Sequence, residues 1–287
     1  MKQRIIINER QVKWISKLLE QNSSDDSILR AYSFDWDDNI VSMPTMIRML
    51  KYENGEWKPK MVSTEEFSKV RNDKDYKLDD DAFYNFREEK EFIKDLKKAI
   101  EDKSFAPSFN KFKEALIYAN PISIITARGH QPITLRKGMD LVISRTFDEN
   151  ELSNMLSNIQ SSYPETKYLT PDKVLEIYLD DIDYHPVSSV EFADRFGLEH
   201  GSAINPEKNK KIAFRDYVEK VIEGADKMVN SKYNKLSVGF SDDDLGNINA
   251  IIPFIKEVLQ VEFPDVDFIV YDTSEGGMNK IVLKQVN

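Results

Sequence analysis

The fold is decided by residues 28–40, Ile-Leu-Arg-Ala-Tyr-Ser-Phe-Asp-Trp-Asp-Asp-Asn-Ile, in which a largely apolar run ends abruptly in acidic residues. A short apolar run bounded by polar turn residues is typical of a buried strand. Asp35, Asp37 and Asp38 therefore follow the end of a predicted strand. Because alternate residues leaving a strand point to the same side, the two-residue spacing lets Asp35 and Asp37 face one site.

Two later apolar runs end in the same way. The run at 122–125 is followed by Thr-Ala-Arg-Gly at 126–129, and the run at 236–240 by Ser-Asp-Asp-Asp at 241–244. Helical patterns separate the runs, and this alternation predicts an α/β fold with a mostly parallel sheet and right-handed crossovers. The carboxyl ends of parallel strands share one edge, where such proteins bind ligands. We therefore expect the three strand ends to converge.

Other elements follow from the same patterns of periodicity and capping. They are helices at 8–20 and 206–222, a helix opened by a capping pair at Asp148 and Glu151, and strands at 187–192, 268–271 and 281–283. The acidic stretch 180–183 has no matching set of metal ligands and is expected to be a solvated loop. His185 and His200 have no spacing typical of metal or triad chemistry, and we expect them to be ordinary polar residues.

Residues 46–106 differ in character from the rest of the chain. Asn54-Gly55 predicts a tight hairpin turn, Ser63 and Glu66 form a capping pair, and a charged helix repeats apolar residues every four positions from Phe92. These features favour an inserted subdomain. A long, decorated connection within the core is the alternative.

Composition excludes several classes of protein. The 287 residues contain no cysteine and only three histidines, which excludes disulfide scaffolds, thiol catalysis and cysteine-ligated metals. No apolar run approaches the roughly 20 residues that span a bilayer, and no leader is visible after Met1, so a soluble, cytoplasmic protein without membrane partners is expected. Glycine-rich phosphate loops, dinucleotide fingerprints and zinc-protease motifs are absent from the sequence.

Net charge bears on the partners. Fifty acidic and 40 basic residues give a charge of −10, which does not favour a polyanion, although a nucleic-acid partner stays open. Carboxylates that converge at one sheet edge repel one another unless a cation joins them. Hard oxygen ligands of this kind suit Mg²⁺, which also binds substrate phosphate.

In these residues the chain resembles the haloacid dehalogenase (HAD) superfamily of phosphohydrolases. The first motif is the strand ending at Asp35-Trp36-Asp37, with Asp38 and Asn39 where the family usually has a small residue and Thr. The second is Ile124-Ile125-Thr126, the third is a helix-start lysine, and the fourth is the strand ending in Ser-Asp-Asp at 241–243. The resemblance implies a HAD-like, Rossmannoid three-layer core of 28–45 and 107–287, a cap of 46–106 inserted between motifs one and two, and an N-terminal helical extension, 1–27.

The resemblance also implies roles for individual residues. Asp35 would be the nucleophile, Asp37 the general acid and base, and Thr126 a hydrogen-bond donor to the phosphoryl group. Ala127 and Arg128 would contribute to substrate binding, and contact with the cap is the alternative for Arg128. Mg²⁺ would be held by Asp35, the carbonyl of Asp37 and Asp242, with Asp243 as a supporting acid.

The phosphate-binding lysine has three candidates at the start of the 206–222 helix. Lys210 lies four residues before Phe214, on the buried face of that helix, so we expect it to serve, with Lys211 second and Lys208 third.

The function expected from these features is Mg²⁺-dependent hydrolysis of a phosphorylated small molecule through an aspartyl-phosphate intermediate. A polynucleotide 3′-phosphatase and a non-catalytic HAD-like binding protein are the alternatives.

Overall fold

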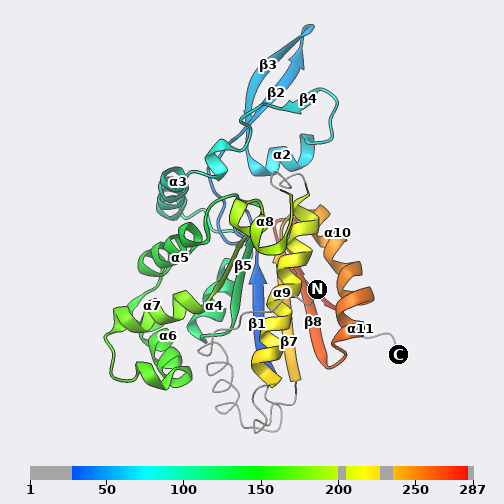
Figure 1. Ribbon diagram of the computed structural model, residues 1–287. Helices are drawn as coiled ribbons and strands as arrows, with labels where there is room; N and C mark the ends of the chain where they lie inside the picture. The colour runs from blue at the N-terminus through cyan, green and yellow to red at the C-terminus, as the bar shows by residue number, and fades with distance from the viewer. Residues whose placement is uncertain (1–27, 200–204, 227–234, 284–287) are drawn as a thin grey trace.

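A six-stranded sheet forms the centre of the computed structural model, which describes residues 28–199, 205–226 and 235–283 (Figure 1). The helix expected at 8–20 and His200 lie outside the described residues. Strand order is β6-β5-β1-β7-β8-β9. The first five of these strands run parallel and the last is antiparallel: β1 (Ile28–Phe34), β5 (Ile122–Thr126), β6 (Asp183–Pro186), β7 (Lys235–Asp242), β8 (Val266–Asp272) and β9 (Asn279–Leu283). The expected α/β fold with a mostly parallel sheet is confirmed.

Helices cover both faces of this sheet. One group, whose members contact one another, consists of α3 (Glu89–Glu101), α4 (Phe109–Ile117), α5 (Pro132–Thr146), α6 (Glu149–Ser162) and α7 (Pro171–Asp181). The other consists of α9 (Pro206–Asp226), α10 (Leu245–Phe254), the π-helical turn η4 (Ile255–Leu259) and α11 (Gln260–Glu262). Because both faces are covered, the central strands are apolar along most of their length, as in β5, where every residue is buried. Within the described residues, no helix has the length and apolar character needed to cross a membrane.

The strand order has one reversal point. From β1 the chain proceeds outward to β5 and β6, and it then returns through α8 (Val190–Phe196) and α9 to β7, on the other side of β1. The carboxyl ends of β1 and β7 therefore flank a topological switch point, where open α/β sheets bind ligands. We call the loops at the carboxyl ends of β1, β5 and β7 the rim.

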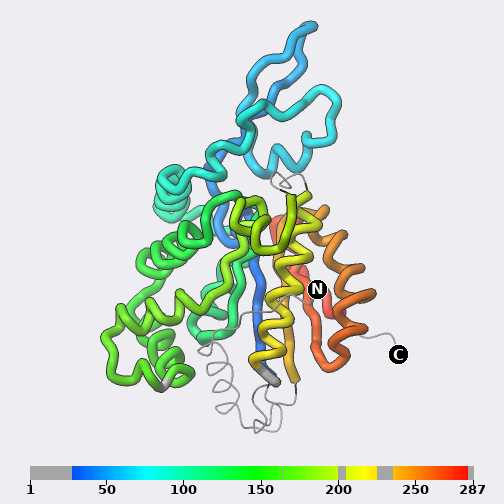
Figure 2. Tube along the Cα trace, in the orientation of Figure 1, coloured from blue at the N-terminus to red at the C-terminus, as the bar shows by residue number. Residues whose placement is uncertain are grey.

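A second, smaller sheet lies within 46–106. Its strands are antiparallel, in the order β3 (Glu56–Val62), β2 (Ile47–Glu53) and β4 (Tyr76–Leu78), and α2 (Thr64–Val70) and the 3₁₀ turn η1 (Tyr84–Phe86) accompany them. Figure 2 shows the β2–β3 hairpin projecting from the rest of the chain. The hairpin turn falls at Asn54-Gly55, as expected, and both residues have positive φ.

Only part of this insertion has its own core. Ile47, Met49, Val62, Ala82 and Phe86 form a hydrophobic cluster separate from the main one. Helix α3, in contrast, buries Phe92 and Leu96 in the main core and packs on α5. Gly138 of α5 permits this approach, since a Cβ there would lie 2.8 Å from a ring carbon of Phe92. Although α3 belongs to the inserted segment in sequence, it packs as part of the helical layer that covers the central sheet.

Two expectations near residue 185 are wrong. The strand expected at 187–192 is instead β6 at 183–186, followed by α8, because Ser189 caps that helix by accepting a hydrogen bond from the Phe192 amide. The stretch 180–183 is not a solvated loop. Asp181 and Asp183 are largely buried, and Asp183 pairs with Lys220 at 2.5 Å.

Candidate active site

Strand register brings Asp35 and Asp242 together on neighbouring strands. The β1–β7 pairing ends at Phe34 opposite Ser241, and the Asp35 amide continues the ladder by donating to the Ser241 carbonyl at 2.9 Å. Asp35 therefore stands beside Asp242, and both side chains are buried. A separation of about 200 residues in the sequence becomes one strand spacing in the fold.

Asp243 completes a cluster of three carboxylates. Asp35, Asp242 and Asp243 each offer an oxygen, and these three oxygens lie within 4.8 Å of one another. The expectation had placed Asp243 as a supporting acid, but its carboxylate converges with the other two. Asp37 does not contribute its side chain to this cluster, and its carbonyl stays a predicted ligand.

The buried lysine beside these carboxylates is Lys210. Its Nζ lies 2.7 Å from Oδ2 of Asp242 and 3.1 Å from Oδ1 of Asp35. Lys208 is exposed and Lys211 only half-buried, so the helical periodicity selected the lysine that faces the acids. One ammonium against three carboxylates leaves the cluster with an excess of negative charge.

Asp242 is the most firmly held of the three acids. Its Oδ2 accepts from Lys210, and its Oδ1 accepts from Asn247 Nδ2 at 2.9 Å and from the Asp244 amide at 3.0 Å. Among the described residues no hydrogen bond reaches the Asp243 carboxylate. Oδ1 of Asp35 is buried, and the Lys210 ammonium at 3.1 Å is the partner that the described residues give it. Asp35 and Asp243 are thus less fully engaged than Asp242.

Burial and mutual repulsion disfavour the ionised acids. Burial, then Asp242 and Asp37, raises the pKa of Asp35 to about 7, although Lys210 opposes the rise. Burial, with Asp242 and Asp35, raises the pKa of Asp243 to about 9. For Lys210, burial lowers the pKa, but the Asp242 and Asp35 carboxylates outweigh it, and the net shift is upward. Two raised carboxyl pKa values and three converging hard oxygen donors, with one ammonium among them, fit a divalent cation such as Mg²⁺.

Asp37 faces Arg128 and not the three-acid cluster. Arg128 donates from Nε and Nη2 to the two carboxylate oxygens, at 2.8 and 2.6 Å. The same Nη2 donates to Thr45 Oγ1, and the guanidinium lies 4.7 and 5.1 Å from the ring centroids of Phe86 and Phe92. With 1% of its surface exposed, Arg128 is enclosed. Of the two expectations for Arg128, contact with the inserted segment is the one that these contacts match, and the substrate role stays a prediction.

The second motif lies on the same rim. Thr126 is the last residue of β5 and is buried; its Oγ1 accepts from the Arg128 amide at 3.3 Å. Ala127 is exposed. His130 is buried against Phe92 and the Glu88 carbonyl, and burial, with the Arg128 charge, lowers its pKa to about 4.

Asn39 supplies a connection that the sequence did not predict. Its Nδ2 donates to Ser241 Oγ at 3.0 Å and to Thr273 Oγ1 at 2.9 Å, so it ties the loop after β1 to the ends of β7 and β8. Ser108 lies 2.7 Å from the same Ser241 hydroxyl. Asn39, at the position where the resemblance would place a Thr, therefore connects the loop after β1 with the ends of β7 and β8 through its side-chain amide. Asn247 was also missed, because nothing local marks a residue in the first turn of α10 as a partner of Asp242.

The insertion contacts the rim through α2. Asp38 has a positive φ of 53° and accepts a hydrogen bond from Thr64, the first residue of α2. Burial raises the pKa of Asp38, and this hydrogen bond opposes the rise. At the other end of α2, Arg71 pairs with Asp244 at 3.1 Å. Both ends of α2 are thereby fastened to loops of the rim.

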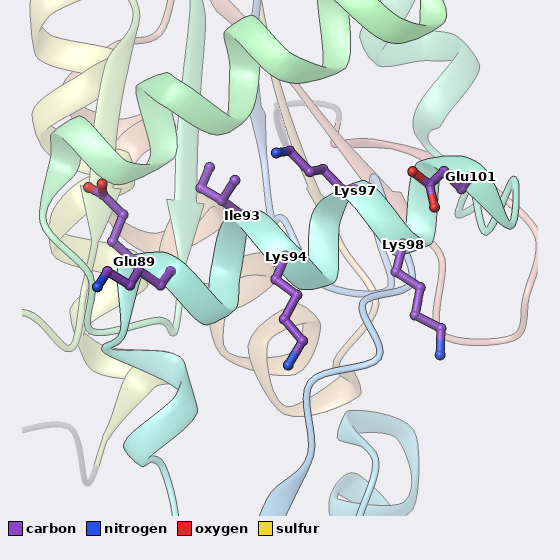
Figure 3. A pocket seen from close by; sticks show the side chains of 7 residues that line it. Glu89, Ile93, Lys94, Lys97, Lys98 and Glu101 are labelled. Carbon is purple, nitrogen blue, oxygen red and sulfur yellow. The ribbon is translucent and has the colours of Figure 1, made fainter.

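A hollow of about 650 Å³ lies elsewhere, along α3 (Figure 3). It is lined by Glu89, Lys90, Ile93, Lys94, Lys97, Lys98 and Glu101. None of the rim carboxylates lines it, and its wall comes from a single helix. It is a basic surface feature and not the centre of the chemistry described above.

Comparison of the chain with models of protein families, with curated proteins and with solved structures finds no match in any of the three. The candidate site is therefore defined by its own geometry: three buried carboxylates, one buried lysine and an arginine-bound aspartate at the switch point of a parallel sheet.

Proposed function

We propose that this protein is a Mg²⁺-dependent phosphatase that hydrolyses a phosphomonoester through a phosphorylated Asp35. The observation that carries the proposal is the convergence of Asp35, Asp242 and Asp243 within 4.8 Å, beside Lys210, at the switch point. The motif order that resembles the HAD superfamily supports the same conclusion. It assigns the nucleophile to the residue whose carboxylate lies at the centre of these contacts.

The cation would be held by the carboxylates of Asp35, Asp242 and Asp243, with the Asp37 carbonyl as the ligand that the resemblance implies. When bound, Mg²⁺ supplies positive charge to the phosphoryl oxygens. Asp243 and Asp35 are the most available ligands, since both oxygens of Asp242 already accept hydrogen bonds.

Chemistry at phosphorus would proceed in two displacements. A carboxylate oxygen of Asp35 attacks phosphorus, the bond to the leaving oxygen breaks, and that oxygen takes a proton from Asp37. Water then gives a proton to Asp37 and attacks phosphorus, which releases phosphate and restores Asp35. Lys210 lies 3.1 Å from an Asp35 oxygen, where its charge stabilises the negative charge that gathers on the phosphoryl group.

The pairing of Asp37 with Arg128 shapes this cycle. Both oxygens of the Asp37 carboxylate accept hydrogen bonds from Arg128, at 2.8 and 2.6 Å, so both are engaged away from the three-acid cluster. To donate a proton in the first displacement, Asp37 must separate from Arg128. The leaving oxygen of the substrate would drive that separation by taking the place of one guanidinium contact.

The experiment is phosphatase activity on an aryl phosphate with and without Mg²⁺, for the wild type and Asp35→Asn. We expect a loss of at least about a thousandfold in kcat for Asp35→Asn, as for other nucleophile substitutions. Asp267→Asn, which changes an exposed acid of β8, is the matched control and should leave kcat unchanged. Equal turnover by the wild type and Asp35→Asn would overturn the proposal.

The same Arg128 clamp favours a second candidate, a non-catalytic protein that binds a metal and a phosphate group. In that case the enclosed guanidinium would hold both Asp37 oxygens permanently, and the carboxylate could not reach a leaving oxygen. Mg²⁺ binding by calorimetry, together with no turnover on a panel of nucleotides, sugar phosphates and aryl phosphates, would support this candidate over the first.

A further inference from the structure

One face of the inserted sheet carries large side chains, and no element within 28–199, 205–226 or 235–283 covers it. In an antiparallel sheet, residues directly opposite each other share a face. Tyr52 pairs with Trp57, Leu50 pairs with Lys77, and Arg48 pairs with Met61, so these side chains lie together. The opposite face contains Ile47, Met49 and Val62 and is buried in the small core. We call the first set the open sheet face.

The open sheet face is exposed although it is partly apolar. Tyr52, Trp57 and Met61 have 46%, 39% and 44% of their surface accessible. Single exposed apolar residues are common on protein surfaces, but a group of them indicates a binding surface. The two aromatic rings are tilted at 56°, with their centroids 5.2 Å apart. Together they make a small aromatic platform on the projecting hairpin.

Positive charge accompanies the rings. Lys77 extends from β4, and its Nζ lies 4.4 Å from the centroid of the Trp57 ring. In a chain of net charge −10, the segment from Ile47 to Val62 has four basic and two acidic residues, a local charge of +2. On the open sheet face itself, Arg48 pairs with Asp79, and Lys77 has no carboxylate partner among the described residues. The platform is thus both aromatic and locally cationic.

We propose that the open sheet face binds single-stranded nucleic acid. Bases stack on exposed aromatic rings without regard to sequence, and lysines beside those rings neutralise the phosphates. Tyr52 and Trp57, on neighbouring strands, provide the stacking surface, and Lys77, which lies against the Trp57 ring, provides the positive charge. The proposal concerns binding and stands apart from the proposed catalysis.

A protein partner fits this region less well. An added strand would have to pair with an edge of the sheet, which is β3 or β4. Strand β4 has only three residues, and β3 contains Pro59 between Lys58 and Lys60. A proline without an amide hydrogen and flanking lysines are features that prevent edge-to-edge pairing. The flat face, and not the edge, is the part left available.

The basic surface on α3 is the competing place for a polyanion. Figure 3 shows Lys94 and Lys98 pointing to the same side of that helix, and Lys97 to the other. None of the residues that line the hollow is aromatic, so α3 offers charge without stacking. Substitutions on the two surfaces can therefore separate the two modes of binding.

The test is fluorescence anisotropy of a labelled 20-nucleotide oligothymidylate with the full chain at low salt in EDTA, where no hydrolysis occurs. We expect binding by the wild type and about a tenfold weaker affinity for Trp57→Ala. Trp57→Phe, which keeps a ring, should retain most of the affinity. Lys77→Gln should weaken binding a few-fold and reduce the dependence of log affinity on log salt by about one phosphate contact.

Three controls keep the outcomes distinct. Tyr168→Ala removes an aromatic side chain that is 90% exposed and lies outside the inserted sheet, and it should not change the affinity. The double variant Lys94→Gln, Lys98→Gln should have a smaller effect than Trp57→Ala. Asp35→Asn should bind as the wild type does, so loss of the proposed catalysis leaves this result intact.

Several outcomes would overturn the proposal. They are the absence of binding at tens of micromolar protein, an affinity unchanged by Trp57→Ala, and a larger loss from the α3 double variant than from Trp57→Ala. Binding to vesicles of anionic phosphatidylserine in place of the oligonucleotide would also overturn it and would assign the platform to a membrane surface.

Discussion

The rim of the central sheet and the open face of the inserted sheet use charged residues in opposite ways. On the rim, Asp35, Asp242 and Lys210 are buried, and their positions are determined by strand register and by short contacts. On the open sheet face, Lys77 and Trp57 are exposed, and Trp57 contacts Lys77 and Tyr52. Burying these charged groups on the rim costs free energy, and the strand register fixes their positions. The exposed side chains of the open sheet face are available to a partner.

The largest effect expected from this contrast is on stability. Replacing Lys210 by Ala leaves Asp35 and Asp242 buried without their cation, and breaking a buried ion pair from one side costs about 3–5 kcal/mol. Lys77→Ala removes an exposed ammonium and should change the free energy of unfolding by less than about 0.5 kcal/mol. Urea denaturation in EDTA measures both. If the two variants lost a similar amount of unfolding free energy, the proposed difference between the buried charges of the rim and the exposed charges of the sheet face would be wrong.

The rim was the more predictable region, for physical reasons. An apolar strand followed by acids is a local signal, and the parallel sheet then brings Asp35 and Asp242 to the same edge. Helical periodicity from Phe214 sufficed to select Lys210. The partner of Asp37 was not predictable in this way, because Arg128 is oriented by Phe86 and Phe92, which come from the insertion and α3.

The open sheet face was largely invisible in the sequence. Asn54-Gly55 marked the hairpin, but which side of it would be covered depends on where Ala82 and Phe86 pack. The strand at 187–192 was misplaced for a related reason. Ser189 can cap a helix as readily as it can stand in a strand, and the polar segment 183–186 is a strand only because it pairs with β5.

The second effect concerns Mg²⁺ and pH. Asp35 and Asp243 have pKa values raised to about 7 and 9, so they bind protons more tightly in the folded state than in the unfolded state. Their contribution to stability is therefore complete below about pH 4 and is lost as pH rises through 7 and 9, by up to about 1.4 kcal/mol per carboxyl and pH unit. A cation at these carboxylates replaces the protons.

We therefore expect Mg²⁺, at a concentration a hundred times its Kd at pH 9, to stabilise the protein by about 2.7 kcal/mol at that pH. At pH 5 the same concentration should stabilise it less. The measurement is the difference in the free energy of unfolding with Mg²⁺ and with EDTA at pH 5, 7 and 9, which cancels titrations elsewhere. In Asp243→Asn the dependence of this difference on pH should be weaker. A stabilisation by Mg²⁺ that is the same at all three pH values would contradict the carboxylate site.

The third effect tests how the two regions are joined. Arg71 at the end of α2 pairs with Asp244, which caps α10, and lies 3.8 Å from Glu207. Arg71→Ala should cost about 1 kcal/mol, since the side chain is only partly exposed and its contacts are charge-assisted, and it should speed hydrogen exchange in α2. Arg48→Ala, which removes a more exposed pair with Asp79, is the control and should leave exchange in α2 unchanged. Equal exchange in the two variants would show that Arg71 does not fasten the insertion.

The smallest effect is confined to the hairpin that supports the open sheet face. Gly55 has a φ of +87°, and a Cβ added there would meet no atom within 4 Å, so Gly55→Ala tests backbone conformation alone. A residue other than glycine in this region costs about 1 kcal/mol. Gly277 is the matched control, because it is equally open and its φ is not in the left-handed region. We expect Gly55→Ala to raise hydrogen exchange in β2 and β3 and to weaken oligonucleotide binding slightly, with phosphatase activity unchanged, while Gly277→Ala alters none of these. If Gly55→Ala instead reduced turnover as much as it reduced binding, the rim and the inserted sheet would be one cooperative unit, and the separation between a buried chemical site and an exposed binding face would fail.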